Sequence, residues 1–259
     1  MLIRTWNLFH GNSVPPGRVG YLEQTVRLAA SGEPAVVALQ ELPVWSLEYL
    51  DDWSGMVALG EVAARPPVPR SLGRRLTAIN QGLFRSLFTG QGNALLIDPG
   101  PRLRARSSIV LNPRSFRRRH ELPLVTRLAW ARERRVCQAA RLTLPDGRTL
   151  TVANFHATKY SRDRRPAEVE VLRAAVFLDA VAEPTDVVVL AGDFNVPPAR
   201  SGIYAELAGW GFTEPTDRGI DHVLVRGAAS GPERRWPEER RRIGGVLVSD
   251  HAPLEVELE

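Results

Sequence analysis

Apolar and polar residues follow two periods along this chain, one typical of strands and the other typical of helices. Residues 2–9 alternate apolar and polar side chains, which predicts a strand. Residues 18–31 carry apolar side chains at helical spacing and end at Ser31-Gly32, a helix stop signal. The apolar run of residues 34–41 predicts a buried strand. A short helix over residues 43–50 and another strand over residues 54–61 follow.

Proline and glycine punctuate the rest of the chain. Between Pro66 and Gly92 they predict a long loop with one helical turn near residues 83–88. Beyond this loop strands dominate, and Asp146-Gly147 between two alternating runs predicts a hairpin. The predicted strands cover residues 93–98, 105–112, 136–144, 149–156, 186–193, 220–227 and 252–259, with another near 122–125. Helices are predicted over residues 164–182 and 199–208, and an arginine-rich strand or loop precedes the closing strand.

This order of elements mixes hairpins with strand–helix–strand crossovers. It predicts an α/β fold in which two packed sheets carry helices on their outer faces. A length of 259 residues is compatible with one domain or two. The candidate chemistry extends from Asn7 to His251, so neither half of the chain holds all of it. We therefore expect one catalytic domain over residues 1–259.

The composition is that of a globular protein, with 44% hydrophobic and 24% charged residues. No stretch is long and apolar enough to span a bilayer, and the N-terminus shows no targeting segment. We therefore expect a cytoplasmic protein without a membrane span, and no feature indicates a protein partner. The single cysteine, Cys137, is expected to pack within a strand rather than to act as a nucleophile.

The charge balance favours an anionic partner. A formal net charge of +5 is typical of proteins that bind nucleic acid, the commonest such partner. Lys159 is the only lysine, however, and a GC-biased genome would produce such an arginine-rich chain without selection for binding. Several arginine clusters nevertheless flank the candidate chemistry, namely Arg70, Arg74 and Arg75, Arg114 and Arg117 to Arg119, Arg162, Arg164 and Arg165, and Arg240 to Arg242.

Polar residues recur where the predicted strands begin or end. Asp250 and His251 stand side by side before the closing strand, where charge next to a core must be paired or bound to metal. Asp193 and Asn195 lie two residues apart, so their side chains can converge on one point. The full set comprises Asn7, Glu41, His156, Asp193, Asn195, Asp221, Asp250 and His251. These residue types suit metal-assisted phosphoester hydrolysis.

Six short motifs carry most of these residues: TWNLF, LQEL, NFH, GDFN, IDH and SDHAP. Because it carries these six motifs in this order, the chain resembles the endonuclease/exonuclease/phosphatase superfamily over essentially its whole length. The resemblance implies a four-layer α/β sandwich with the site at one edge of the paired sheets. It also implies a metal site in which Glu41 is the principal ligand and Asn7 and Asp250 complete or support it. Mg²⁺ suits such oxygen ligands, with Mn²⁺ as an alternative, and the number of ions stays open.

The same resemblance assigns catalytic roles. Asp193 would orient or deprotonate the attacking water, and Asn195 would hold that water or a phosphate oxygen. His251 is the other candidate base, or a donor to the phosphate, and Asp221 resembles its orienting carboxylate. Which of Asp193 and His251 takes the proton stays open.

His156 resembles a transition-state donor or general acid, and Asn154, two residues earlier on the same strand face, is expected to position the phosphate. In the pancreatic-type nucleases a glutamate supports the equivalent of His156. The segment TGQGNALL offers only amides there, so Gln91 or Asn93 is expected to take this role. His222 is expected to be a packing residue.

Three functions are compatible with these residues. The first is a divalent-metal phosphodiesterase acting on DNA or RNA, favoured by the basic charge. The second is a phosphatase or phosphodiesterase acting on a phospholipid or small-molecule phosphate, and the third is an inactive binding module. The complete set of catalytic residue types disfavours the third. The short connection from Asn195 to Asp221 also disfavours abasic-site repair, which needs a longer loop.

Overall fold

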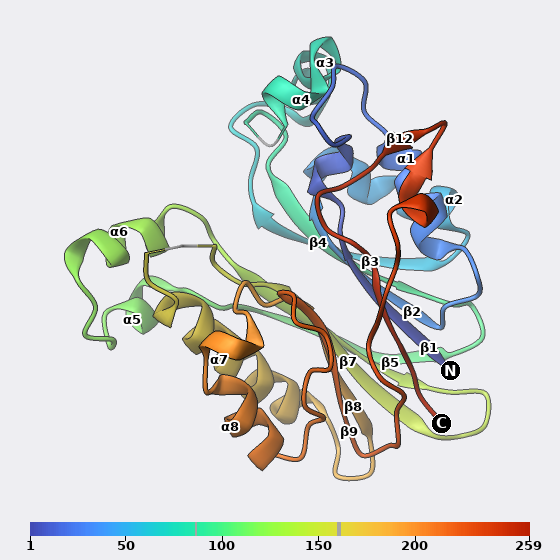
Figure 1. Cartoon of the computed structure of the whole chain (residues 1–259), viewed down its shortest axis with the longest axis vertical. Helices are drawn as coiled ribbons and strands as arrows, with labels where there is room; N and C mark the ends of the chain where they lie inside the picture. The colour runs from blue at the N-terminus through green and yellow to red at the C-terminus, as the bar shows by residue number, and fades with distance from the viewer. Residues whose placement is uncertain (86, 160–161) are drawn as a thin grey trace.

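The computed structural model describes residues 1–85, 87–159 and 162–259 (Figure 1). Its strands are β1 (Leu2–Asn7), β2 (Val36–Leu42), β3 (Val57–Ala64), β4 (Gln91–Ile97), β5 (Arg102–Val110), β6 (Val136–Thr143), β7 (Thr149–His156), β8 (Val187–Asp193), β9 (Asp221–Arg226), β10 (Arg234–Arg235), β11 (Arg242–Ile243), β12 (Val246–Leu247) and β13 (Leu254–Glu257). Its α-helices are α1 (Leu22–Ala30), α2 (Leu50–Ser54), α3 (Arg70–Ile79), α4 (Gln81–Phe84), α5 (Arg114–Arg117), α6 (Leu124–Ala131), α7 (Arg165–Val181) and α8 (Ile203–Gly209). Short 3-10 helices are η1 (Phe9–Gly11), η2 (Val44–Glu48), η3 (Pro198–Arg200) and η4 (Glu239–Arg241).

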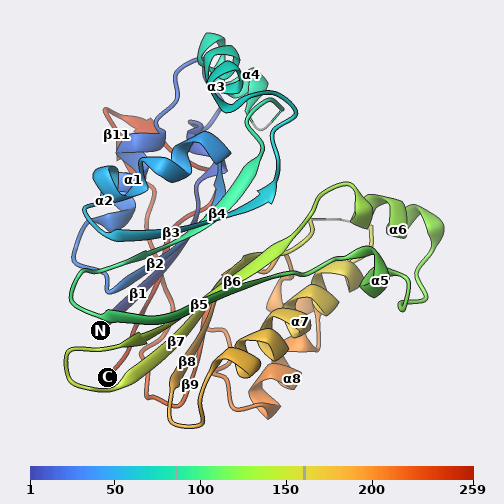
Figure 2. The ribbon, with the colours of Figure 1, turned by 180° about the vertical axis from the view of Figure 1, so that it is seen from behind.

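Two mixed sheets pack face to face. One has the strand order β10-β13-β1-β2-β4-β3, and the other has the order β5-β6-β7-β8-β9. Figures 1 and 2 show α1 and α2 on the outer side of the first sheet and α7 and α8 on the outer side of the second. This arrangement confirms the predicted four-layer α/β sandwich. Residues such as Ile3, Leu95, Leu150 and Val189 fill the core between the sheets.

The topology brings distant chain segments to one edge of this sandwich. β1 runs parallel to β2, and β7 runs parallel to β8 with His156 opposite Asp193. Because parallel strands end at the same edge, the polar residues that close these four strands meet there. β9 runs antiparallel to β8 and begins there, with Asp221 opposite Asp193.

Two sequence predictions for secondary structure were wrong. The segment between Pro66 and Gly92 contains α3 and α4 rather than a long loop with one turn. The buried positions of α3 include Gly73 and Thr77, so the helix lacks the large apolar stripe that predicts one. Gly73 is required by close packing, since a Cβ atom there would lie 2.4 Å from the Phe88 carbonyl oxygen.

The apolar residues near 122–125 do not form a strand but lead into α6. Pro123 precedes the first turn of this helix, a position that proline tolerates. Thr126 and Trp130, four residues apart, form its buried face, while Leu124 and Val125 stay exposed. The helix thus turns its leucines outward, opposite to the usual pattern of a core helix.

Other predictions hold. Cys137 is fully buried in β6, and burial raises the pKa of its thiol. His222 is fully buried, contacts Phe194 and Tyr204 edge to face, and lies 3.1 Å from Glu233, as expected of a packing residue. In the described part of the chain, no helix has the length and hydropathy needed to cross a membrane.

Candidate active site

Asp193 lies at the centre of the polar cluster. It ends β8, is 1% exposed, and is contacted from both sheets. Asn7 at the end of β1 donates from Nδ2 to Asp193 Oδ2 over 3.0 Å and to Glu41 Oε1 over 3.2 Å. One amide thus holds two carboxylates together across the seam between the sheets.

His156 closes β7 beside this pair. Its Nε2 lies 3.5 Å from Asp193 Oδ2 and 3.9 Å from Glu41 Oε1, and its Nδ1 lies 3.4 Å from Gln91 Nε2. Burial, and then the positive charge of Arg135, hold the pKa of His156 well below its usual value. The imidazole is therefore neutral. Donation from Gln91 to Nδ1 leaves the ring proton on Nε2, which faces the carboxylates.

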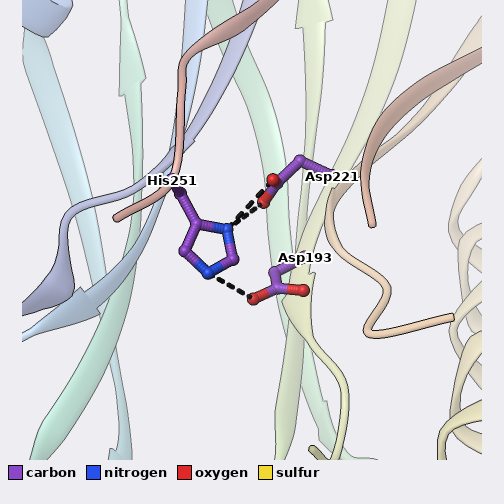
Figure 3. Close-up of side chains that lie close together, drawn as sticks. All are labelled: Asp193, Asp221 and His251. Atoms are coloured by element: carbon purple, nitrogen blue, oxygen red, sulfur yellow. Dashed lines mark hydrogen bonds and ion pairs between the residues drawn. The ribbon is translucent and has the colours of Figure 1, made fainter. Parts of the chain in front are cut away.

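His251, from the segment just before β13, also faces Asp193 (Figure 3). Its Nδ1 lies 2.9 Å from Asp221 Oδ1, and its Nε2 lies 3.8 Å from Asp193 Oδ2. Burial by itself would lower the pKa of His251, but the hydrogen bond and charge of Asp221 outweigh it and raise the pKa to about 9. The ring is therefore charged at neutral pH. Burial and the charge of Asp221 raise the pKa of Asp193, against the opposing effects of His251 and Asn7.

Several backbone conformations around the cluster are unusual. Glu41 has a φ of 54° and lies where the β2–β4 register shifts, between Leu39 and Leu42. Asn195 has a φ of 53°, which lets its backbone N–H donate to Asp193 Oδ1 over 3.0 Å. The adjoining loop residues Phe9, His10 and Ser249 also have positive φ. Left-handed non-glycine residues are costly and concentrate at functional sites, and five of the seven in the described residues lie at this cluster.

Two predicted residues stand at the margin of the cluster. The Asn195 side chain donates from Nδ2 to the Ala157 carbonyl oxygen over 3.0 Å, which fixes its oxygen end. Asp250 is exposed, and its charge acts on His251 and on His10. Asp193, Asp221 and His251 each offer a ligand atom within 4.8 Å of the others, so a cation could also be held there.

Asn154 does not reach the surface of the site, contrary to the prediction that it positions a phosphate. It is fully buried between the sheets. Its Nδ2 donates to the Leu39 and Ala94 carbonyl oxygens, and its Oδ1 accepts from Gln40 Nε2 over 2.8 Å. These contacts join β7 to β2 and β4. The side chain faces inward because alternate residues of a strand share a face, and the inner face at this position meets the other sheet.

The sequence did not point to two buried basic residues near the cluster, His10 and Arg135. His10 Nε2 lies 3.4 Å from Glu41 Oε2, and its Nδ1 is buried without a partner among the described residues. Arg135 is 5% exposed, and in the same part of the chain its Nε and Nη1 have no partner. Neither residue belongs to a recognised motif. Only their positions, three residues after Asn7 and one before β6, indicated proximity to strand ends.

The choice between Gln91 and Asn93 as the support for His156 can be tested. Gln91 contacts the His156 ring, whereas Asn93 Nδ2 donates to the Val136 carbonyl oxygen at 3.4 Å. Gln91→Ala is expected to lower kcat about tenfold, the equivalent of one hydrogen bond. Asn93→Ala, the matched control, is expected to leave kcat within about twofold. Steady-state hydrolysis of bis-p-nitrophenyl phosphate measures both, and equal losses would contradict the assignment.

The fold and the cluster together define a class of phosphoester hydrolases. The family model described as Endonuclease/Exonuclease/phosphatase family matches residues 5–251. The chain belongs to this family. No curated protein matches the sequence.

Solved structures share the fold across the whole chain. A conserved protein of unknown function from Enterococcus faecalis V583 is 16% identical with a TM-score of 0.69, covering 100% of this chain and 99% of that one. A mannosyl-6-phosphatase from Bacteroides thetaiotaomicron is 15% identical with a TM-score of 0.67, covering 100% and 99%. The human Nocturnin catalytic domain is 16% identical with a TM-score of 0.67, covering 100% and 94%. At these identities the likeness concerns the fold alone.

Proposed function

We propose that residues 1–259 form one catalytic domain that hydrolyses phosphodiester bonds with a divalent metal ion. One observation carries this proposal: Asn7, His156 and His251 converge on the buried Asp193 carboxylate, with Glu41 beside it. The neutral imidazole of His156, the charged imidazole of His251 and the carboxylate of Asp193 then lie within one small site. This is the combination that in-line attack on a phosphate requires.

The donor set fits Mg²⁺, with Mn²⁺ as an alternative. Glu41 is partly exposed and, within the described residues, forms no ion pair with lysine or arginine, its partners being His10 and His156. Its charge near the Asp193 carboxylate therefore needs compensation from a cation. Glu41, Asn7 and Asp250 would hold the ion, since oxygen ligands suit Mg²⁺. A bound ion supplies Lewis-acid stabilisation of charge on the phosphoryl oxygens.

The protonation states divide the catalytic work. The charged His251 donates to a phosphoryl oxygen, and Asp221 keeps it charged and oriented. This leaves Asp193 as the base that orients the water and accepts its proton, with Asn195 holding the water or a phosphate oxygen. His156 donates from Nε2 to charge developing in the transition state. Arg135, whose Nε and Nη1 have no partner among the described residues, adds positive charge that acts on His156.

Nucleic acid is the first candidate substrate, because the chain is basic and arginine clusters flank the candidate catalytic segments in the sequence. Exposed leucines on α3, α4 and α6 favour the second candidate, a phospholipid or small-molecule phosphate. Hydrolysis of single-stranded DNA, duplex DNA, RNA and bis-p-nitrophenyl phosphate should be measured with Mg²⁺ and after chelation. We expect metal-dependent turnover of the small diester. No turnover of any substrate above that of Asp193→Asn would refute the proposal.

Salt dependence separates the substrate classes. If the site grips nucleic acid through several phosphates, log affinity for duplex DNA falls with log salt by about 0.9 per phosphate contact. Fluorescence anisotropy with labelled duplex DNA measures this slope. A flat response would exclude nucleic acid as the ligand while leaving hydrolysis of the small diester intact.

Replacing Glu41 by glutamine is expected to weaken metal binding about 100-fold or more, since loss of even an outer-shell partner costs about 10–100-fold. Electron paramagnetic resonance of free Mn²⁺ measures the affinity without substrate. Glu48→Gln, an exposed carboxylate a few residues later, is the matched control and should bind Mn²⁺ normally. Equal affinity of both variants would show that Glu41 is not a ligand.

A further inference from the structure

Exposed apolar side chains concentrate on two helical projections. Of eleven large apolar residues that are exposed in the described part of the chain, seven lie on these projections, at 46–69% exposure. We name them the α3–α4 lip, formed by Leu72, Ile79, Leu83 and Leu87, and the α6 lip, formed by Leu124, Val125 and Leu128. Single exposed leucines are ordinary, whereas clusters of this kind mark interaction surfaces.

Both lips are attached directly to the active site. The α3–α4 lip leads into β4, whose first residue, Gln91, contacts His156. The α6 lip leads into β6 through Arg135, whose charge acts on His156. Figures 1 and 2 show α3 and α4 beyond the end of the first sheet and α6 beyond the end of the second, apart from each other. The lips therefore flank the edge that carries the catalytic cluster.

A groove with three arginines lies next to the α6 lip. It has a volume of about 660 Å³ and lies between the end of β3 and the end of α6. Arg65, Arg132 and Arg134 line it, and Arg134 Nη1 donates to the Ala63 carbonyl oxygen over 3.2 Å, which ties the two sides together. The groove thus places three arginines, together with Glu61, beside the C-terminal end of α6.

The charge of this surface is strongly one-sided. Between Glu61 and Asp98 the sequence has no acidic residue but has Arg65, Arg70, Arg74, Arg75 and Arg85. Between Leu111 and Glu121, the segment that leads to α6, acidic residues are again absent, and arginines stand at 114 and 117–119. Within α3 the exposed Arg70, Arg74 and Arg75 alternate with Leu72. Such interleaving of arginine and leucine is typical of helices that lie in the interface of an anionic bilayer.

The side chains favour lipid over nucleic acid as the occupant. Single-stranded nucleic acid is bound by aromatic side chains that stack on bases. The exposed side chains of the lips are instead aliphatic, and α6 turns Leu124, Val125 and Leu128 outward while Thr126 faces the core. Aliphatic side chains gain most by leaving water for an acyl environment.

We propose that the α3–α4 lip and the α6 lip dock onto an anionic lipid surface and present the active site to a phosphate ester of a lipid headgroup. The arginines would contact lipid phosphates while the leucines enter the acyl boundary. This inference rests on the proposed phosphoester hydrolysis and develops its second candidate substrate class, a phospholipid. Docking itself requires no metal and no turnover, so it can be measured separately.

Cosedimentation with vesicles tests the docking. The full chain is expected to bind vesicles of phosphatidylglycerol and phosphatidylcholine and to bind pure phosphatidylcholine vesicles at least about tenfold more weakly. Leu124→Gln/Val125→Gln/Leu128→Gln, which keeps helix-compatible residues on an exposed face, is expected to reduce binding about tenfold or more. Val57→Gln/Val176→Gln is the matched control, since both valines are similarly exposed but lie outside the lips.

Activity assays separate this inference from the proposed function. The α6 variant should keep the wild-type kcat on bis-p-nitrophenyl phosphate but lose phosphate-ester hydrolysis on anionic vesicles. Equal vesicle binding by the α6 variant and the control would overturn the inference. So would a lip variant that loses binding to single-stranded DNA while keeping its binding to vesicles, which would make the surface a nucleic-acid site. Absence of hydrolysis in every assay would instead count against the proposed function.

Discussion

Asp193→Asn is expected to lower kcat by about 10²–10⁴-fold, the usual contribution of a positioned general base. The amide keeps the size of the side chain but cannot accept a proton from water. It also removes the negative charge that faces the rings of His156 and His251 at 3.5 Å and 3.8 Å. Single-turnover hydrolysis of bis-p-nitrophenyl phosphate at saturating Mg²⁺ measures the chemical step.

The control for this substitution is Asp52→Asn, an exposed carboxylate in α2. It should retain wild-type kcat. Circular dichroism establishes that the Asp193 variant is folded at the assay temperature. A folded Asp193→Asn protein that keeps more than about a tenth of wild-type kcat would exclude Asp193 as the base.

Asp221→Asn is expected to move the alkaline limb of the pH–rate profile to lower pH. Asp221 is the partner that raises the pKa of His251 to about 9, against the opposing effect of burial. The charged ring is present below this pKa and is lost as the pH rises through it. Without the carboxylate, burial dominates and the pKa falls, so the variant has a neutral His251 at pH 8. We expect kcat/KM at pH 8 to fall about 10–100-fold and to recover partly at lower pH.

Measurement of kcat/KM from pH 5 to 10 tests this prediction. Asp98→Asn, an exposed carboxylate outside the cluster, should leave the profile unchanged. NMR titration of the His251 ring gives the pKa without turnover. If the alkaline limb of Asp221→Asn coincides with that of wild type, then His251 does not act in its charged form.

The helices α3 and α6 were not predicted from the sequence because, unlike core helices, they do not bury a continuous apolar face. Periodicity predicts a helix when its apolar residues face the core. In α6 the leucines face outward, and in α3 the buried face includes Gly73 and Thr77, so both helices escaped recognition. The strands β2 and β8 were predicted more successfully because both of their faces are buried, and such runs read as apolar whatever packs on them.

The site likewise has residues that the sequence identifies and partners that it does not. Motifs such as GDFN and SDHAP singled out Asp193 and His251 because the proposed catalytic residues stand next to strand ends in the sequence. The partners of those residues come from elsewhere in the chain. Gln91 lies 65 positions from His156 and Asn7 lies 186 positions from Asp193, distances over which no local pattern operates.

By itself the sequence determined the α/β class, most strands and the residue types of the site, because hydrophobic period and short motifs are local properties. Only the tertiary structure decided which neighbours act on them. It places Gln91 rather than Asn93 against His156, turns Asn154 inward between the sheets, and brings His10 to Glu41. It also sets two leucine-bearing helices on either side of the site. These contacts join segments that are far apart in the sequence. They form only when the two sheets pack together, so no local pattern predicts them.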